Sequence, residues 1–187
     1  MDTPKDCRSL MIGATGMLTP ALHHAAAQAT HMLNLARHAT QFTPPPGVPK
    51  ETYEAHDVDY ENVKAVEQLL NAHGPFTTAL TWIRPKALPL RDLIANHMRP
   101  QGHLIEVMGS AASRPGALAD QRRATMAAFP NITYSQLILG FMPKDETSPT
   151  SRWLTHDEIA TAACAILDTP APRTIVGHVE PWEARPQ

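Results

Sequence analysis

The chain has 187 residues, of which 43% are hydrophobic and 18% are charged, and its formal net charge is −2. These values predict one globular domain spanning residues 1–187. Without a basic patch, nucleic-acid binding is not expected, and no apolar run is long enough to span a membrane.

Cysteine and histidine usage indicates the protein's cellular environment and the kinds of site it is expected to contain. The two cysteines, Cys7 and Cys164, are far apart in the sequence, which favours a reducing, cytoplasmic environment over a disulfide framework. The residues up to Arg8 are too polar for a signal peptide. The ten histidines are scattered without the spacing of metal ligands, so no metal site is predicted.

The N-terminal segment carries the strongest functional pattern. A strand at Ser9–Ile12, a turn containing Gly13 and Gly16, and a helix from Pro20 to Thr30 follow one another. This order builds the pyrophosphate site of a dinucleotide. Gly13 permits a tight turn, Gly16 lets the backbone approach phosphates, and the helix start presents N–H groups to the anion.

The remaining residues of this turn are Thr15, Met17 and Leu18, and they complete the predicted cofactor-binding loop. The motif lacks its third glycine, because Thr19 stands at that position. An ordinary structural turn is therefore the alternative interpretation.

Strands and helices alternate along the rest of the chain. Further strands are predicted at His31–Ala36, just before Asp57, and at Thr77–Ile83, His103–Met108, Ile132–Leu139 and Thr174–Val176. Helices are predicted at Tyr60–His73, Lys86–Met98, Ala117–Phe129 and after a capping box, Thr155 to Glu158. Prolines in 43–49 exclude a helix from the second crossover. The pattern predicts an α/β, doubly wound Rossmann fold with a mainly parallel sheet of six or seven strands and helices on both faces.

In this architecture the chain resembles the short-chain dehydrogenase/reductase (SDR) superfamily, and within it an atypical, shortened branch. The resemblance rests on Gly13-Ala14-Thr15-Gly16, Arg37, Asp57-Val58, Ser110, Gly140 and the passages 152–155 and 179–183. It implies an NAD(P)-dependent oxidoreductase that acts on a small-molecule substrate, which the sequence does not identify.

The resemblance also assigns cofactor roles. Arg37 lies about 20 residues after Gly16, where NAD-binding proteins carry an acid for the ribose. A guanidinium there binds a 2′-phosphate instead, with help from His38, which implies NADP(H). A solvated arginine after a strand is the alternative.

Three further positions match cofactor contacts of the family. Asp57 and Val58 correspond to residues that meet the adenine, although Asp57 could instead cap a helix. Trp82 stands at the end of the fourth strand, where it would crowd or stack on the cofactor or pack in the core. Gly140 follows the sixth strand and completes the implied cofactor site.

The catalytic residues of the family are only partly present. Ser110 fits the serine position, although it could equally be a turn residue. The helix predicted at Ala117–Phe129 has no tyrosine and no lysine, so the Tyr-x-x-x-Lys pair is missing there. The spacing of Tyr60 and Lys64 matches the pair, but at the adenine end, and it is interpreted as coincidence. Tyr134 is interpreted as a packing residue.

Two functions remain open, with a third less favoured. The first is an NADP(H)-dependent oxidoreductase with a replaced acid, such as Ser110 with water. The second is a non-catalytic NADP(H)-sensing regulatory or interaction module. Methyl transfer from S-adenosylmethionine is disfavoured by Arg37. Leu90, Leu93 and Ile94 fit either a homodimer interface or the core, and 142–151 is predicted to be a polar loop.

Overall fold

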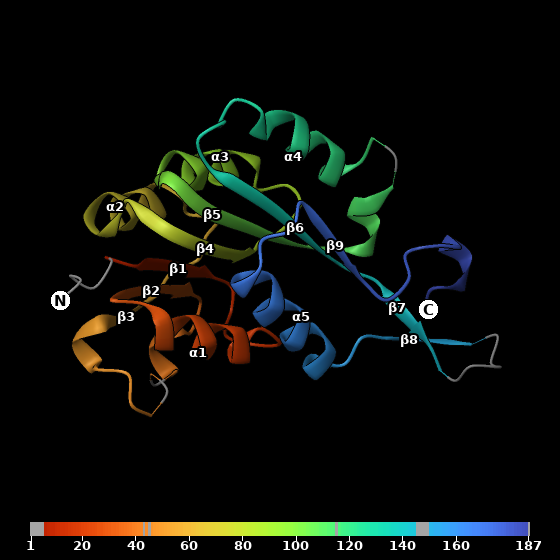
Figure 1. Ribbon diagram of the computed structural model, residues 1–187, viewed down its shortest axis with the longest axis horizontal. Helices are drawn as coiled ribbons and strands as arrows, with labels where there is room; N and C mark the ends of the chain where they lie inside the picture. Colours follow the sequence, from red (N-terminus) through yellow and green to blue (C-terminus); the bar gives the residue numbers. More distant parts are fainter. Residues whose placement is uncertain (1–5, 43, 45, 115, 145–149, 187) are drawn as a thin grey trace.

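The main sheet of the protein has seven strands, all parallel (Figure 1). The computed structural model describes residues 6–42, 44, 46–114, 116–144 and 150–186. The strand order is β3-β2-β1-β4-β5-β6-β9. The bounds are β1 (Arg8–Ile12), β2 (His31–Ala36), β3 (Tyr53–Asp57), β4 (Phe76–Trp82), β5 (Met98–Gly109), β6 (Thr133–Leu139) and β9 (Arg173–Val176). The predicted doubly wound α/β fold is confirmed, and the order reverses between β1 and β4.

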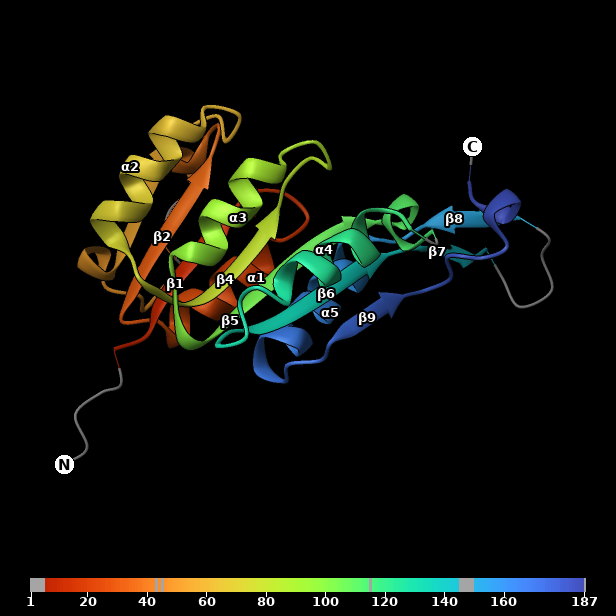
Figure 2. The same cartoon turned by 90° about the horizontal axis from the view of Figure 1, so that it is seen from above.

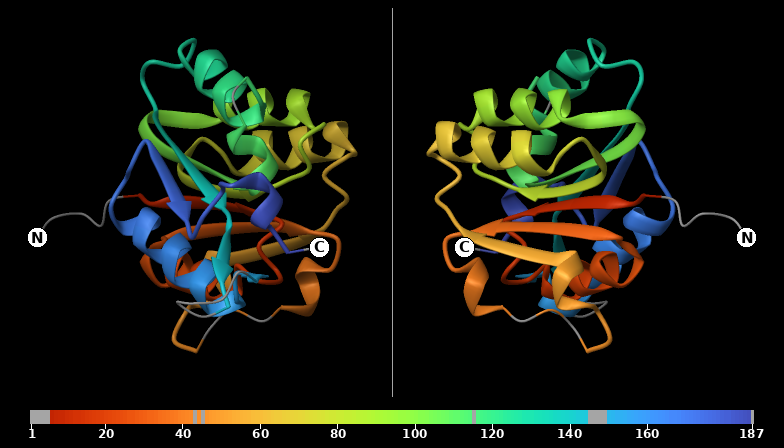
Figure 3. Two further views of the ribbon diagram at one scale, coloured as in Figure 1. Left: turned by 90° about the vertical axis from the view of Figure 1, so that its right-hand side faces the viewer. Right: turned by 90° about the vertical axis from the view of Figure 1, so that its left-hand side faces the viewer.

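Helices cover both faces of the sheet (Figure 3). On one face lie α1 (Thr19–Gln28) and α5 (His156–Asp168). On the other lie α2 (Val63–His73), α3 (Leu88–Asn96) and α4 (Leu118–Met126). Along β1, Met11 packs in the first layer while Leu10 and Ile12 pack in the second. Both faces of this strand are buried, which explains why its sequence is continuously apolar.

Helix ends follow the local signals. The Asn62 side chain accepts a hydrogen bond from the Ala65 N–H at 3.2 Å and begins α2. The predicted capping box of Thr155 and Glu158 begins α5. Two hydrogen bonds from Arg152, at 2.8 and 2.9 Å, lower the pKa of Glu158 to about 2.

Two local expectations are wrong. Since α2 begins at Val63, Tyr60 lies in the preceding turn and does not share a helix face with Lys64. In place of the polar loop at 142–151, β7 (Phe141–Pro143) and β8 (Ser151–Trp153) form an antiparallel pair. Strands of three residues are too short to show an alternating pattern. This pair lies at the other end of the molecule from β2 (Figure 2), and 145–149 lie outside the described residues.

The second crossover has no α-helix among its described residues, as predicted. Two short 3₁₀ turns, η1 (Ala39–Gln41) and η2 (Lys50–Thr52), connect β2 to β3. In α3, Leu90 and Ile94 are buried inside this chain, so they serve the core rather than a dimer interface. No helix in the described part of the chain has the length and apolar character needed to cross a membrane.

Candidate functional site

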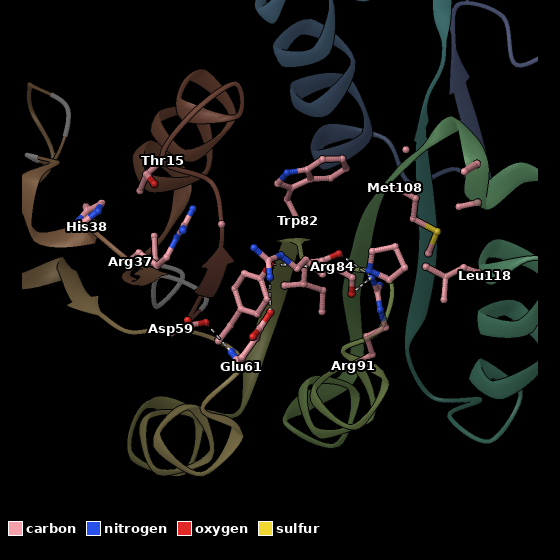
Figure 4. A pocket seen from close by; sticks show the side chains of 18 residues that line it. Thr15, Arg37, His38, Asp59, Glu61, Trp82, Arg84, Arg91, Met108 and Leu118 are labelled. Atoms are coloured by element: carbon pink, nitrogen blue, oxygen red, sulfur yellow. Dashed lines mark hydrogen bonds and ion pairs between the residues drawn. The ribbon is translucent and has the colours of Figure 1, made fainter. Parts of the chain in front are cut away.

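A cavity of about 600 Å³ lies at the carboxyl ends of the central strands (Figure 4). Arg37 and His38, which follow β2, line one end of it. Trp82, the last residue of β4, lies between the two ends. Met108 and Leu118 line the other end. The cavity therefore occupies the crevice where doubly wound folds bind ligands.

The first turn borders this cavity through Gly13 and Thr15. Gly13 has a φ of +73°, and a Cβ there would lie 2.4 Å from the Trp82 carbonyl oxygen. Only glycine fits this close approach, so Gly13 serves the contact between β1 and β4. Around Gly16, by contrast, a Cβ would meet no atom within 4 Å, which leaves that side of the loop open.

Backbone N–H groups of the loop are free to bind an anion. Within the described chain, the N–H groups of Thr15, Gly16 and Met17 donate to no acceptor. The Thr19 N–H donates to the Gly16 carbonyl at 3.0 Å, and Pro20 has no N–H. The loop thus offers the amide donors that the sequence analysis assigned to the helix start.

The other residues of the predicted loop anchor it. Leu18 is fully buried and Met17 packs against the core on the α1 side. Neither side chain lines the cavity. Because the Leu18 side chain is fully buried, its contact with a ligand would come from the backbone.

Arg37 is an exposed cation at the cavity wall. Over the ranges that the structure describes, its guanidinium makes no hydrogen bond and no ion pair with a protein group. Figure 4 shows it close to His38, with Thr15 from the first turn nearby. This placement brings three of the predicted cofactor residues to one end of the cavity.

Asp57 and Val58 are placed differently. The Asp57 carboxylate accepts hydrogen bonds from the Thr40 N–H and hydroxyl, both at 2.8 Å, and these bonds lower its pKa. The Val58 N–H donates to the Ala36 carbonyl at 2.9 Å. Neither residue lines the cavity. Asp57 therefore holds η1 against β3, and its contact with adenine stays a prediction.

One wall of the cavity, lined by Asp59, Tyr60, Glu61 and Arg84, was not predicted from the sequence. The Arg84 guanidinium pairs with Glu61 at 2.8 Å, and the Arg84 backbone N–H donates to the Tyr60 hydroxyl at 3.3 Å. This contact joins the turn before α2 to the segment after β4, and Asp59 lies beside it (Figure 4). Sequence alone could not find this wall, because its residues lie about 20 positions apart and match no motif. Lys64 is exposed and does not line the cavity.

Ser110 and Gly140 lie outside the cavity lining. Ser110 is buried at the start of η3 (Ser110–Ser113), although its neighbours Gly109 and Ala111 line the cavity. Its catalytic role stays a prediction. A Cβ on Gly140 would lie 2.2 Å from the His178 carbonyl oxygen, so this glycine permits the close approach of two chain segments.

A cluster of buried charges lies next to the cavity, which Arg91 also lines. Glu106 on β5 lies 3.1 Å from Arg91 Nη1 and 3.2 Å from Arg122 Nη2. The Tyr134 hydroxyl donates to Glu106 at 2.7 Å. Burial and the Glu106 charge raise the pKa of Tyr134 well above its ordinary value, so it is a poor proton donor at neutral pH.

Comparison with known proteins relates the fold to solved structures. No protein-family model and no curated protein matches this sequence. A short-chain dehydrogenase/reductase described as glucose/ribitol dehydrogenase, from Brucella melitensis, matches with a TM-score of 0.67 and 14% identity, covering 91% of this chain and 94% of that one. The NADH-dependent reductase A1-R′ complexed with NAD matches with a TM-score of 0.64 and 15% sequence identity, and the match covers 92% of this chain and 96% of that one. A short-chain dehydrogenase/reductase from Serratia marcescens matches with a TM-score of 0.61 and 11% sequence identity, and the match covers 92% of this chain and 97% of that one.

The fold is SDR-like. In this fold the helix that follows β5 and η3 is α4, where the resemblance implies a tyrosine and a lysine. The described α4 contains neither. Arg122 on α4 instead extends inward to Glu106 and Asp92. In the described structure, α4 thus contributes ion pairs that hold it against β5 and α3.

Proposed function

We propose that this protein binds NADP(H) in the cavity and is an oxidoreductase of the SDR type with non-standard catalytic residues. The observation that carries the proposal is the unpaired guanidinium of Arg37 beside the open first turn. An arginine that is buried, or whose N–H donors already bind a carboxylate, has less capacity for a ligand phosphate. An arginine in this position suits the 2′-phosphate that distinguishes NADP from NAD.

The cavity fits the cofactor in three respects. The free N–H groups of Thr15, Gly16 and Met17 can donate hydrogen bonds to a diphosphate, and the open side of Gly16 allows its approach. Arg37 and His38 can hold the additional phosphate. A volume of about 600 Å³ lies within the range of cofactor and ligand sites.

The opposite end of the cavity suits the reacting groups. A bound nicotinamide supplies or accepts a hydride. Around it, Met108, Ala112 and Leu118 provide an apolar lining that limits water, while the Trp82 ring lies between the two ends. Ser110 is next to this region, and a water bound there is the proton donor that the proposal requires.

A second function has its own support. Tyr134 is held by Glu106, α4 lacks the tyrosine and lysine, and Ser110 does not line the cavity. These observations favour a module that binds NADP(H) without turnover and reports its redox state to a partner.

Calorimetric titration with NADP, NAD and S-adenosylmethionine tests cofactor binding. We expect NADP to bind at least about tenfold more tightly than NAD, because charge-assisted hydrogen bonds are each worth about 1.5–3 kcal/mol. Arg37→Ala should remove this preference. Arg84→Ala is the matched control, since Arg84 also lines the cavity but is paired with Glu61. No binding of NADP to the folded protein would refute the proposal.

Turnover separates the two functions. With binding established, loss of NADPH absorbance in the presence of a panel of aldehydes, ketones and quinones would identify an oxidoreductase. Binding without turnover, together with different thermal shifts for NADP and NADPH, would identify the sensing module.

A further inference from the structure

Three side chains that could ligate a metal ion meet at the edge of the sheet, away from the cavity. Glu54, His56 and His73 each present one ligand atom, and these atoms all lie within 4.8 Å of one another. His56 Nε2 is 2.7 Å from Glu54 Oε1, and His73 Nδ1 is 3.4 Å from Glu54 Oε2. Two imidazoles and a carboxylate are a common ligand set for zinc.

Regular structure fixes all three positions. Glu54 and His56 are two residues apart on β3, so they point to the same face of the sheet. His73 is the last residue of α2, which packs on a face of the same sheet. The His73 carbonyl oxygen accepts a hydrogen bond from Arg8 at 3.0 Å, which ties the end of α2 to the start of β1. The cluster therefore lies at the end of the sheet opposite to the cavity.

The cluster is accessible to an ion and to water. The side chains of Glu54, His56 and His73 are 52%, 35% and 29% exposed. β3 is an edge strand, and a hollow of about 40 Å³ lined by Glu54 and His73 adjoins them. This volume is enough for a water molecule, which could complete a tetrahedral site.

The surrounding charges are compatible with a cation. Arg8 also lines the hollow, but its Nε is paired with Asp6 at 3.4 Å. Glu51 and His31 line the hollow as well. With neutral imidazoles the ligand set carries one negative charge, and Glu51 adds a second close by.

We propose that Glu54, His56 and His73 form a binding site for a divalent transition metal of the zinc class. Imidazole nitrogen favours zinc, copper and nickel over magnesium and calcium, which prefer all-oxygen sites. A bound ion joins β3 to the end of α2, and thus clamps the edge strand whose other end carries Asp57 and η1. This site is independent of the cofactor proposal.

Calorimetry of the untagged protein with ZnCl₂ tests the site, and CoCl₂ provides a spectroscopic probe. We expect one equivalent of Zn²⁺ to bind and Co²⁺ to develop the intense visible bands of tetrahedral coordination. His56→Ala and His73→Ala should each weaken Zn²⁺ binding at least about tenfold, and Glu54→Gln should also weaken it. Zn²⁺ should raise the melting temperature of the wild type but not of the two histidine variants.

His24→Ala is the matched control. His24 is also a partly exposed histidine paired with a carboxylate, that of Asp168 at 2.7 Å, but among the residues that the structure describes no second histidine completes its group. This variant should bind Zn²⁺ as the wild type does. Unchanged Zn²⁺ affinity in the His56 and His73 variants, or no binding to the wild type, would overturn the proposal. If a variant does not fold, histidine-ring NMR signals of the wild type decide, since Zn²⁺ must shift those of His56 and His73.

Discussion

Arginines near the cavity fall into two groups with opposite surroundings. Arg91 and Arg122 are 1% and 2% exposed, and both contact Glu106. Arg37 and Arg84 are exposed at the cavity wall. Burial makes charge pairing obligatory, because an unpaired ion away from water is costly. An exposed arginine can do without a partner: within the described chain Arg37 has none, whereas Arg84 pairs with the exposed Glu61. The arginine side chain therefore maintains the fold in the buried group, while in the exposed group Arg37 stays available for a ligand.

Glu106→Gln is expected to have the largest effect, because it removes the counter-charge of the buried Arg91 and leaves the buried Arg122 paired with Asp92 alone. Breaking a buried ion pair from one side costs about 3–5 kcal/mol in the free energy of unfolding. Urea unfolding followed by circular dichroism measures this loss. A change below about 1 kcal/mol would show that water reaches this cluster and that the two groups of arginines do not differ.

His103 extends the comparison to a second buried group on β5. Burial lowers its pKa from 6.5 to about 4, and its Nε2 lies 2.8 Å from the Ser135 hydroxyl. Well above pH 6.5 the imidazole is neutral in both the folded and the unfolded state. As the pH falls from 6.5 toward 4, only the unfolded state takes up a proton, so stability decreases.

The expected loss due to His103 between pH 7.5 and 5 is about 2 kcal/mol. Urea unfolding at both pH values measures it, and His103→Gln should remove most of the difference. The carboxylates with lowered pKa, such as Asp57 and Asp120, lose their contribution only at more acidic pH. An equal pH dependence in the variant would contradict the assignment.

Arg37→Ala should separate recognition from stability. Since this side chain has no partner in the described protein, the free energy of unfolding should change by less than about 0.5 kcal/mol. NADP affinity should nevertheless fall, and its dependence on salt should become weaker, because an exposed charge is screened by ions. Calorimetry at low and high NaCl, beside urea unfolding, tests both parts. A large loss of stability would show that Arg37 is a structural residue.

The smallest effect is expected for Glu61→Gln, which repeats the Glu106 substitution at the cavity wall. The Glu61–Arg84 pair is exposed on both sides, at 55% and 67%. Exposed ion pairs contribute about 0–1 kcal/mol, so the free energy of unfolding should hardly change. Urea unfolding under the conditions used for the Glu106 variant gives the direct comparison. A loss similar to that of Glu106→Gln would refute the distinction between buried and exposed pairs.

Local sequence signals predicted the order of the helices and of the strands in the main sheet, but not the β7–β8 pair. The strand at His31–Ala36 has the predicted bounds, and the capping box of Thr155 and Glu158 forms as expected. These features depend on residues close in sequence: apolar runs for strands, and a side chain bonding a backbone N–H three positions on. The expected helix from Tyr60 failed at its first residues, because Asn62 caps α2 instead.

The candidate site was predictable only in part. The sequence located Gly13, Thr15, Arg37, His38 and Trp82, and all five line the cavity. The other predicted cofactor residues do not line the cavity: Gly16, Met17, Leu18, Asp57, Val58 and Gly140. A motif marks where a chain turns, but it does not show whether a carboxylate is already bonded to a neighbour, as Asp57 is to Thr40.

The sequence by itself determined the alternation of strands and helices, the glycine turn after β1 and the absence of a Tyr-x-x-x-Lys pair on α4. Only the tertiary structure decided that Gly13 faces the Trp82 carbonyl, that Arg122 pairs with Glu106, and that Glu54, His56 and His73 meet. The physical reason is the separation in sequence between the residues that interact. Strand and helix formation depends on neighbours along the chain, whereas charge pairing, close backbone approach and ligand clusters depend on residues that folding brings together from distant positions.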